Sequence, residues 1–227
     1  MKVQAILPTA GLGERLKTKI PKPLISLQGK PVFVYSLTAL EQSSLIDSMV
    51  LVVHSQYIPA FKTEVQKFHL RKVKKIISGG KTRADSVKKG LEALDKDTDI
   101  VLVHDGVRPF LTTKLIEEGI RLCKEAGAVV AAVPVKPTIK KIDPVRLIVE
   151  ETLPRDILWE AQTPQIFKRD LLEKAFAEND GKRTTDDASL VEQLGVKVKI
   201  FMGDYKNIKI TTPEDLMIAE AFLKHGI

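Results

Sequence analysis

The sequence is poor in the residues that form disulfides, base-stacking surfaces and membrane spans. Its single cysteine, Cys123, excludes an internal disulfide and a metal site built from cysteines. Aromatic residues make up only 5% of the chain, which leaves little material for stacking nucleic-acid bases. The longest apolar runs, residues 100–103 and 128–135, are far too short to span a membrane, and the first residues lack a signal-peptide pattern. These absences predict a cytoplasmic protein.

The length and composition of the chain are typical of a folded globular domain. The 227 residues are 44% apolar and 29% charged, which excludes a disordered chain and favours one domain over two small ones. The formal charge of +7 fits nucleic acid, acidic lipid or phosphorylated substrates. Because a nucleic-acid surface also needs aromatic residues among its cations, phosphorylated small molecules are the better explanation of this charge.

Apolar runs alternate with amphipathic stretches along most of the chain. The predicted strands are residues 3–7, 49–54, 73–77, 100–103, 128–135 and 196–201. The predicted helices are residues 31–42, 58–70, 83–94, 114–126, 169–176, 187–194 and 213–223. Strands that are apolar throughout are typical of a parallel sheet covered by helices on both faces, so the order predicts an α/β fold.

The alternation breaks at about residues 136–159. This stretch is rich in charges and β-branched residues, and Asp143-Pro144 is a turn signal, so we expect a protruding β-arm. Two later helices have marked starts. Thr212 precedes a proline and two acids, and Thr184 stands three residues before Asp187, which predicts a capping box at each position.

The first predicted strand runs into a glycine-rich turn at residues 9–16. Such a turn allows backbone N–H groups to approach phosphates closely. It is not a dinucleotide-binding fingerprint, because Leu16 stands where the third glycine would be. Arg15 and Lys22 add two cations to the same loop, and the prolines on both sides of Lys22 restrict its backbone. We interpret the loop as a phosphate site rather than a plain surface turn.

A second segment, residues 78–87, also follows a strand and opens a helix. Its Gly-Lys-Thr resembles the end of a P-loop, but Lys75 stands where the upstream glycine would be, so that motif is excluded. Thr82 and Asp85 have the spacing of a capping box. Taken alone, the segment leaves a binding role and a structural role open.

A third segment, residues 104–109, follows the strand at residues 100–103. Carboxyl ends of parallel strands are where such sheets bind ligands. Asp105 there suits Mg²⁺ that is held mainly by a ligand's phosphates, because Mg²⁺ commonly takes only one or two protein carboxylates. The alternative is a buried structural pair of Asp105 with Arg108. We interpret His104 as a packed neighbour, since no zinc-like cluster accompanies it.

Together these segments resemble the 2-C-methyl-D-erythritol 4-phosphate cytidylyltransferases of the non-mevalonate isoprenoid pathway, over essentially the full length. The matching stretches are residues 10–15, 21–22, 79–87, 104–109, 133–135, 159–165, 185–189 and 207–211. The resemblance implies a Rossmann-like three-layer nucleotide-diphospho-sugar transferase fold with a mostly parallel sheet. It implies one nucleotidyltransferase domain over residues 1–227, with the β-arm at about 136–159 used for dimerisation.

The implied reaction is transfer of CMP from CTP to 2-C-methyl-D-erythritol 4-phosphate, with Mg²⁺ as cofactor and pyrophosphate released. By the same resemblance, the catalytic cations are Arg15, Lys22 and Lys209. The nucleotide-binding positions are Ala10, Gly11, Gly80 and Ser86, and the metal-associated carboxylate is Asp105. The positions for the sugar-alcohol phosphate are Thr138, Arg155, Thr163 and Thr185. The family forms homodimers whose arms reach the neighbouring site, which would place Thr138 and Arg155 across that interface.

Pro23 departs from this family's pattern, because members usually have glutamine after the Pro-Lys pair. Pro-Lys-Pro-Leu is common in nucleotidyltransferases that act on hexose 1-phosphates. Ribitol 5-phosphate cytidylyltransferase therefore remains an alternative substrate assignment. A non-catalytic nucleotide-binding protein is a remote alternative, because it would have lost Arg15, Lys22 or Asp105. An RNA-binding protein would need a basic face interleaved with aromatics. We expect neither nucleic acid nor membrane as a partner.

Overall fold

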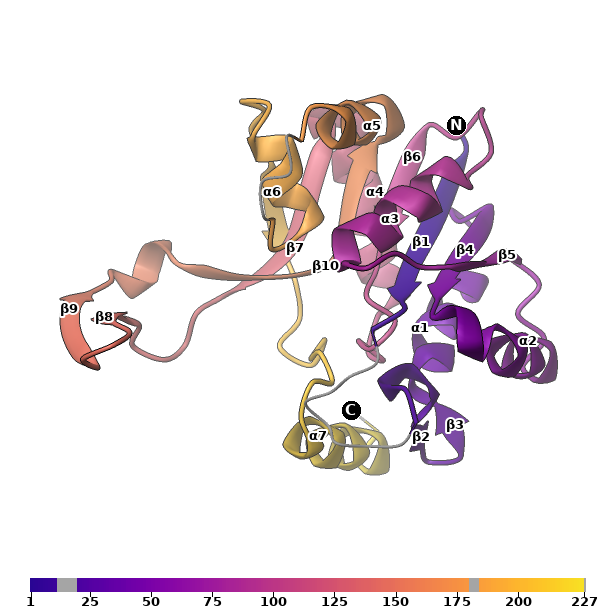
Figure 1. The fold of residues 1–227 in the computed structure, drawn as a ribbon, viewed down its shortest axis with the longest axis horizontal. Coiled ribbons are helices and arrows are strands. Elements are labelled where there is room, and N and C mark those ends of the chain that lie inside the picture. Colours follow the sequence, from indigo (N-terminus) through magenta and orange to yellow (C-terminus); the bar gives the residue numbers. More distant parts are fainter. Residues whose placement is uncertain (12–19, 180–183, 227) are drawn as a thin grey trace.

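A central sheet of seven strands organises the molecule. The computed structural model describes residues 1–11, 20–179 and 184–226. The strand order in the sheet is β11-β7-β10-β6-β1-β4-β5. All neighbouring strands run parallel except β10, which is antiparallel to both β6 and β7. Figure 1 shows the sheet with helices around it and a long arm extending to one side. The predicted α/β fold with a mostly parallel sheet is confirmed.

The bounds of the elements follow the predicted alternation closely. The strands are β1 (Val3–Thr9), β2 (Ser26–Leu27), β3 (Lys30–Pro31), β4 (Ser48–Val53), β5 (Val73–Ser78), β6 (Ile100–Val103), β7 (Ala128–Pro134), β8 (Lys140–Asp143), β9 (Ile148–Thr152), β10 (Trp159–Lys168) and β11 (Lys199–Met202). The helices are α1 (Val32–Gln42), α2 (Ile58–Lys67), α3 (Arg83–Glu92), α4 (Thr113–Ala126), α5 (Arg169–Ala177), α6 (Asp187–Glu192) and α7 (Pro213–Lys224). Short 3-10 helices are η2 (Lys22–Leu24), η3 (Ser55–Tyr57) and η4 (Arg155–Ile157).

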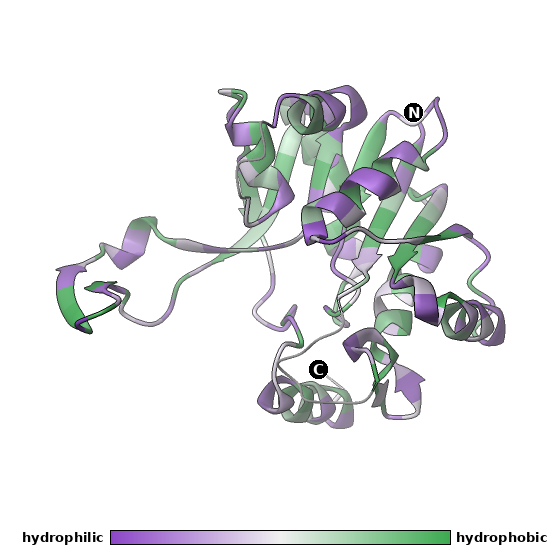
Figure 2. Ribbon diagram, in the orientation of Figure 1, coloured by the Kyte–Doolittle hydropathy of each residue, from purple (hydrophilic) through white to green (hydrophobic). Residues whose placement is uncertain are grey.

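Each face of the sheet has its own apolar core. Successive side chains of a strand point to opposite faces. In β1, Leu7 therefore packs in the core under α1, α2 and α4, whereas its neighbour Ile6 packs in the core under α3, α5 and α6. Burial on both faces explains why these strands are apolar throughout, and Figure 2 shows their hydrophobic colouring. A third, smaller core joins α7 to the β2–β3 hairpin.

The arm departs from the body between β7 and β10. It consists of the antiparallel pair β8–β9 and the short helix η4, and Figure 1 shows it projecting away from the sheet. At its turn, Asp143 accepts hydrogen bonds from the backbone N–H groups of Val145 and Arg146, as expected for a turn that starts at Asp-Pro. The predicted arm is confirmed as a structural element.

Two predictions about local structure were incomplete or wrong. The sequence interpretation placed no strand at β10, although this strand lies inside the sheet. Its pairing with β7 skips from Ala161 to Gln165, which accommodates Pro164, a residue without a backbone donor. The predicted capping box from Thr184 was also wrong: Asp186 is the N-cap of α6, and its carboxylate accepts a hydrogen bond from Ser189 N.

Among the described residues, no helix has the length and apolar character needed to cross a membrane.

Candidate active site

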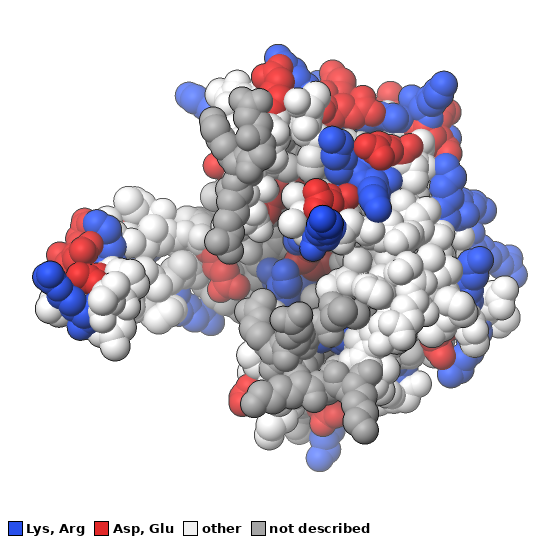
Figure 3. Space-filling model, in the orientation of Figure 1, with Lys and Arg blue, Asp and Glu red and all other residues white. Residues whose placement is uncertain are grey.

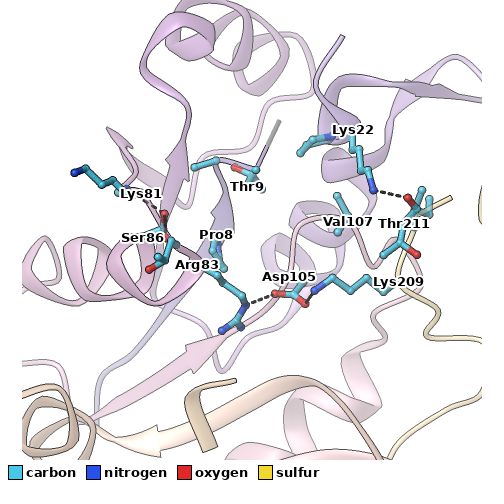
Figure 4. A pocket seen from close by; sticks show the side chains of 16 residues that line it. Pro8, Thr9, Lys22, Lys81, Arg83, Ser86, Asp105, Val107, Lys209 and Thr211 are labelled. Carbon is cyan, nitrogen blue, oxygen red and sulfur yellow. Dashed lines mark hydrogen bonds and ion pairs between the residues drawn. The ribbon is translucent and has the colours of Figure 1, made fainter. Parts of the chain in front are cut away.

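A cavity of about 440 Å³ opens at the carboxyl ends of β1, β5 and β6. Loops that follow these strands form its walls, together with η2 and the segment that precedes α7 (Figure 4). It contains the predicted site residues Ala10, Gly11, Lys22, Gly80, Ser86, Asp105 and Lys209. The position is the one that parallel sheets commonly use for ligands.

Two glycines bring the loop after β5 against the loop after β1. A side chain on Gly79 would place its Cβ 2.5 Å from the Cβ of Ala10, and one on Gly80 would stand 2.2 Å from the Cβ of Asp85. Neither distance is possible without moving backbone. Glycine at position 79 therefore allows the loop after β5 to meet the predicted phosphate loop after β1, and glycine at position 80 allows it to fold against the start of α3.

The start of α3 fixes the second loop. Thr82 and Asp85 form the predicted capping box, with Thr82 Oγ1 accepting from Asp85 N and Asp85 Oδ2 accepting from Thr82 N, each at 3.0 Å. The buried Ser86 hydroxyl accepts from Gly80 N at 3.1 Å and donates to the Thr82 carbonyl at 3.0 Å. The segment thus has both of the roles that the sequence left open: it caps a helix and lines the cavity.

Lys22 reaches the cavity from η2. Its flanking prolines restrict the backbone, and its side chain is buried. The ammonium donates a hydrogen bond to the carbonyl of Thr211, which comes from a segment almost two hundred residues later in the chain. Asp215 holds that segment by accepting from the N–H and the hydroxyl of Thr211, both at 2.7 Å. Lys22 is therefore already positioned by the fold.

Asp105 is the buried carboxylate of the cavity. Its Oδ1 accepts from Arg83 Nε at 2.9 Å, and its Oδ2 lies 2.8 Å from Lys209 Nζ (Figure 4). Burial alone would raise the pKa of the Asp105 carboxyl, but the charges of Arg83 and Lys209 outweigh it and hold the pKa well below its usual range. Asp105 is thus ionised at any physiological pH.

The alternative pairing of Asp105 with Arg108 contributes little. Arg108 Nε is 3.9 Å from Asp105 Oδ2, at the limit of an ion pair, and Arg108 Nη1 donates instead to the Asn207 carbonyl at 2.7 Å. The closer partner, Arg83, lies in the family-like stretch of residues 79–87, but the sequence interpretation gave it no role. Its position three residues after Gly80, at the start of α3, was the signal that could have identified it.

A second buried carboxylate stands behind Arg83. Asp187, the first residue of α6, is fully buried, and its Oδ2 lies 2.8 Å from Arg83 Nη1. Burial raises the pKa of the Asp187 carboxyl, and the attraction of Arg83 opposes that shift. The two carboxylates together hold the pKa of Arg83 above its ordinary value despite its burial. The sequence interpretation assigned Asp187 only to a helix cap.

His104 is a packed neighbour, as expected. It is completely buried, and burial lowers its pKa to about 4, so the ring is neutral. Its Nε2 lies 3.1 Å from the Arg108 carbonyl and must donate, which makes Nδ1 the acceptor for the Thr163 hydroxyl at 3.0 Å. The Thr163 oxygen in turn accepts from Asp105 N at 3.1 Å. This chain of bonds fixes the backbone of Asp105.

The structure separates the other predicted residues from the cavity. Thr163 lies behind Asp105 with its hydroxyl proton already used, and Thr185 is exposed just before α6. Thr138 and Arg155 are exposed on the arm, where Arg155 Nη1 donates to the Lys136 carbonyl at 3.0 Å. Arg15 lies outside the described residues. Roles for these residues in substrate binding stay predictions.

The single carboxylate of Asp105 fits a metal ion, such as Mg²⁺, whose other ligands are phosphate oxygens of the nucleotide and water. No group of three or more His, Cys, Asp or Glu side chains that could hold a metal ion occurs within residues 1–11, 20–179 and 184–226. A lone ionised carboxylate retains acceptor capacity beyond its two cationic partners, because each oxygen carries two lone pairs. Mg²⁺ bound to nucleotide phosphates needs no more than one or two such ligands from the protein.

Comparison with known proteins decides the family. The family model described as 2-C-methyl-D-erythritol 4-phosphate cytidylyltransferase matches residues 3–225. The chain belongs to this family. A cytidylyltransferase of this name from Dehalococcoides mccartyi (strain ATCC BAA-2266 / KCTC 15142 / 195) is 47% identical over 225 residues, which cover 99% of this chain and 97% of the relative. The one from Geotalea uraniireducens (strain Rf4) is 42% identical over 229 residues, with 99% and 97% covered.

Solved structures agree with this assignment. The crystal structure of 4-diphosphocytidyl-2C-methyl-D-erythritol synthase from Anaerococcus prevotii DSM 20548 is similar with a TM-score of 0.85 and 34% identity, covering 98% of this chain and 96% of that one. The cytidylyltransferase structure from Thermus thermophilus gives a TM-score of 0.80 at 29% identity, covering 99% and 100%. The predicted family and enzyme class are confirmed, and the ribitol 5-phosphate alternative receives no support.

Proposed function

We propose that this cytidylyltransferase transfers CMP from CTP to 2-C-methyl-D-erythritol 4-phosphate. The products are 4-diphosphocytidyl-2-C-methyl-D-erythritol and pyrophosphate, in isoprenoid precursor synthesis. One observation carries the proposal for this site: a glycine-walled cavity at the sheet edge holds Lys22 and Lys209 beside the buried carboxylate of Asp105. Such a cavity suits a polyanionic nucleotide whose reacting phosphate must be neutralised.

The chemistry needs little proton transfer. An oxygen of the substrate's phosphate monoester attacks the α-phosphorus of CTP, and the bond from that phosphorus to the bridging oxygen of the β-phosphate breaks. A phosphate monoester is already a nucleophile near neutral pH, so catalysis rests on positioning and charge neutralisation. The structure agrees with this scheme, because His104 is buried and neutral and both of its ring nitrogens are engaged.

The cavity cations have distinct tasks in this proposal. Lys22 stabilises negative charge that develops at the α-phosphorus. Its bond to the Thr211 carbonyl holds it in place before the substrate arrives, so it need not reorganise during the reaction. Lys209, whose ammonium lies 2.8 Å from Asp105 Oδ2, is a second cation near the α-phosphate. Arg15, outside the described residues, is proposed as the third cation.

The nucleotide would occupy the glycine wall. Gly80 and Ser86 lie on one side of the cavity and Ala10 and Gly11 on the other. Gly11 lines the cavity, and apart from its own chain neighbours no atom of the described residues lies within 4 Å of where its Cβ would be. Close backbone approach of this kind allows N–H groups to bind the base and phosphates of CTP.

Asp105 would hold Mg²⁺ together with the phosphates of CTP. When bound, Mg²⁺ would neutralise charge on the pyrophosphate that leaves. The chain's own contribution is a carboxylate that is ionised, buried and held by Arg83.

The arm completes the site in a homodimer. Its turn exposes large apolar side chains, with Val145 90% and Leu147 75% accessible, and Figure 2 shows hydrophobic segments between hydrophilic ones at the end of the arm. A lone hairpin is marginally stable in water and needs a partner surface. We propose that each arm reaches the neighbouring subunit, where Thr138 and Arg155 contact the sugar-alcohol phosphate.

The surface charge of the body bears on the proposed partners. On the face drawn in Figure 3, acidic side chains lie among the Lys and Arg side chains around the body, unlike the continuous basic stripe of a nucleic-acid surface. The proposed partners are CTP, the sugar-alcohol phosphate and a second copy of the chain. We propose a cytoplasmic enzyme, which cell fractionation with an antibody would test.

A pyrophosphate-release assay tests the substrate assignment. CTP and UTP are each combined with 2-C-methyl-D-erythritol 4-phosphate, ribitol 5-phosphate and hexose 1-phosphates in the presence of Mg²⁺. We expect rapid release only from CTP with the methylerythritol phosphate. Faster release with ribitol 5-phosphate would overturn the acceptor, and release with a hexose 1-phosphate would overturn the family-based assignment and give Pro23 a specific meaning.

A further inference from the structure

Asp187 is a buried carboxylate that the proposed mechanism does not use. It lies outside the cavity wall, and its only close cationic partner among the described residues is Arg83, at 2.8 Å. We propose that Asp187 is a positioning residue of the active site, which orients the Asp105 carboxylate through Arg83. The proposal rests on the proposed function, since Asp105 and Arg83 line the proposed CTP cavity.

The guanidinium of Arg83 is a rigid link between the two carboxylates. Nε binds Asp105 Oδ1 at 2.9 Å, and Nη1 on the same planar group lies 2.8 Å from Asp187 Oδ2. Because the donors of a guanidinium stand in a fixed geometry, holding Nη1 also fixes the direction in which Nε points. Arg83 therefore cannot turn away from Asp105 toward a bound phosphate without breaking its contact with Asp187.

A buried clamp fixes Asp187 relative to the sheet. The Oε1 atom of Gln165 accepts from the N–H groups of Asp187 and Ala188, both at 3.0 Å, and Gln165 Nε2 donates to Asp186 at 2.8 Å. Gln165 belongs to β10, and its register partner in β6 is Val103, two residues before Asp105. The start of α6 and the carboxylate of the cavity are thus attached to adjacent strands.

Stability alone does not account for this arrangement. Neither Oδ1 nor Oδ2 of Asp187 has a hydrogen-bond partner in the part of the chain that the structure describes, so the 2.8 Å contact of Oδ2 with Arg83 is an ion pair without hydrogen-bond geometry. A buried carboxylate that is only partly satisfied costs free energy, and well-packed apolar residues in place of a buried ion pair are often as stable. A role in holding Arg83, and through it Asp105, explains why a charge stands at this position.

A double-mutant cycle tests this role. The variants are Asp187→Asn, Arg83→Gln and the combination, each measured for kcat, for KM of CTP and for melting temperature. We expect Asp187→Asn to lower kcat about 10- to 100-fold, the usual effect of losing an outer partner of a metal-associated group, with less change in KM. In the Arg83→Gln background the same substitution should change kcat less than about twofold, because the link is already cut.

Melting temperatures separate positioning from folding. Arg83→Gln leaves the Asp187 charge buried without its partner, so adding Asp187→Asn should recover part of the lost stability but none of the lost kcat. The matched control is Glu192→Gln, which removes a carboxylate charge from the exposed end of the same helix, α6. It should keep kcat within about twofold of the wild type.

Three kinetic results would overturn the proposal. They are wild-type kcat in folded Asp187→Asn, an equal loss of kcat from Asp187→Asn in both backgrounds, and an equal loss in the Glu192→Gln control. A crystal structure of Asp187→Asn gives a readout independent of turnover: Arg83 should be displaced from Asp105, and an unmoved Arg83 would contradict the positioning role. If the wild type releases no pyrophosphate from CTP, the proposed function fails, and this structure still decides whether Asp187 holds Arg83.

Discussion

In the cavity, the predicted site residues that the structure describes are held by partners from their own chain, whereas those on the arm are exposed. Asp105 is enclosed between Arg83 and Lys209, and Lys22 is bonded to the Thr211 carbonyl. On the arm, Arg155 bonds only a nearby carbonyl among the described residues, beside apolar side chains such as Leu147 that face water. The body therefore contains a preorganised charge site, whereas the arm presents exposed charged and apolar residues.

This difference predicts where substitutions act. Changes in the cavity should lower turnover, because groups that are fixed in advance stabilise the transition state. Changes on the arm should weaken acceptor binding or dimer formation and leave CTP binding largely intact.

The largest effect is expected for Lys22→Ala. Removing one preorganised cation from a phosphoryl-transfer site should lower kcat by about 10²–10³. The matched control is Lys62→Ala on the exposed surface of α2, which should retain wild-type kinetics. Steady-state pyrophosphate release measures both. Near-normal kcat in folded Lys22→Ala would remove this residue from the mechanism.

The buried His104 predicts a loss of stability in acid. Its folded-state pKa of about 4 lies below the value of 6.5 for an unperturbed histidine, so the unfolded chain binds a proton between these pH values that the folded chain does not. The contribution of His104 is complete above pH 6.5 and is lost as the pH falls to 4, by about 3 kcal/mol. Urea denaturation at pH 7, 5.5 and 4 measures the free energy of unfolding. In His104→Gln the pH dependence should be shallower by that amount, and parallel curves would contradict the assignment.

Arg155→Ala should act on the acceptor alone. Loss of a charge-assisted contact with a phosphate should raise KM for 2-C-methyl-D-erythritol 4-phosphate about 10- to 100-fold, with little change in KM for CTP. Arg146→Ala on the same arm is the control, because Arg146 lies at the turn and forms only a long ion pair with Asp143, at 3.8 Å. Equal changes in both KM values would show that Arg155 serves the fold rather than the acceptor.

The smallest effect is expected at the metal. In Asp105→Asn the half-maximal Mg²⁺ concentration should rise about tenfold, since a neutral amide is a weaker ligand while the CTP phosphates still bind the ion. A titration of rate against free Mg²⁺ at saturating CTP measures this. An unchanged midpoint would leave Asp105 as a partner of Arg83 and Lys209 only.

The sequence predicted the elements that follow simple periodicity and the residues that lie on glycine loops. It missed β10, because Pro164 and the polar residues around it hide a strand whose pairing skips three positions. It also missed the ion pair of Arg83 with Asp187, because that contact depends on α3 and α6 meeting on one face of the sheet. Local spacing contains no information about that contact.

The two predicted site residues on the arm could not be identified from the periodicity or spacing of one sequence. Thr138 and Arg155 were assigned by resemblance, and nothing in their own surroundings would have identified them, because both side chains are exposed. In the proposed dimer, their ligand lies in a different subunit from their backbone. Neither periodicity nor spacing within one sequence can show such a site.

Complementation between the Lys22→Ala and Arg155→Ala variants tests the shared site most directly, with the acceptor kept near the KM of the wild type so that each variant alone has little activity. Lys22→Ala and Arg155→Ala are allowed to exchange subunits, and heterodimers are verified by differential tags and light scattering. A heterodimer then has one site with both residues intact, so an equal mixture should regain up to about a quarter of wild-type activity. If verified heterodimers recover no activity while each variant remains folded, the arm does not complete the neighbouring site.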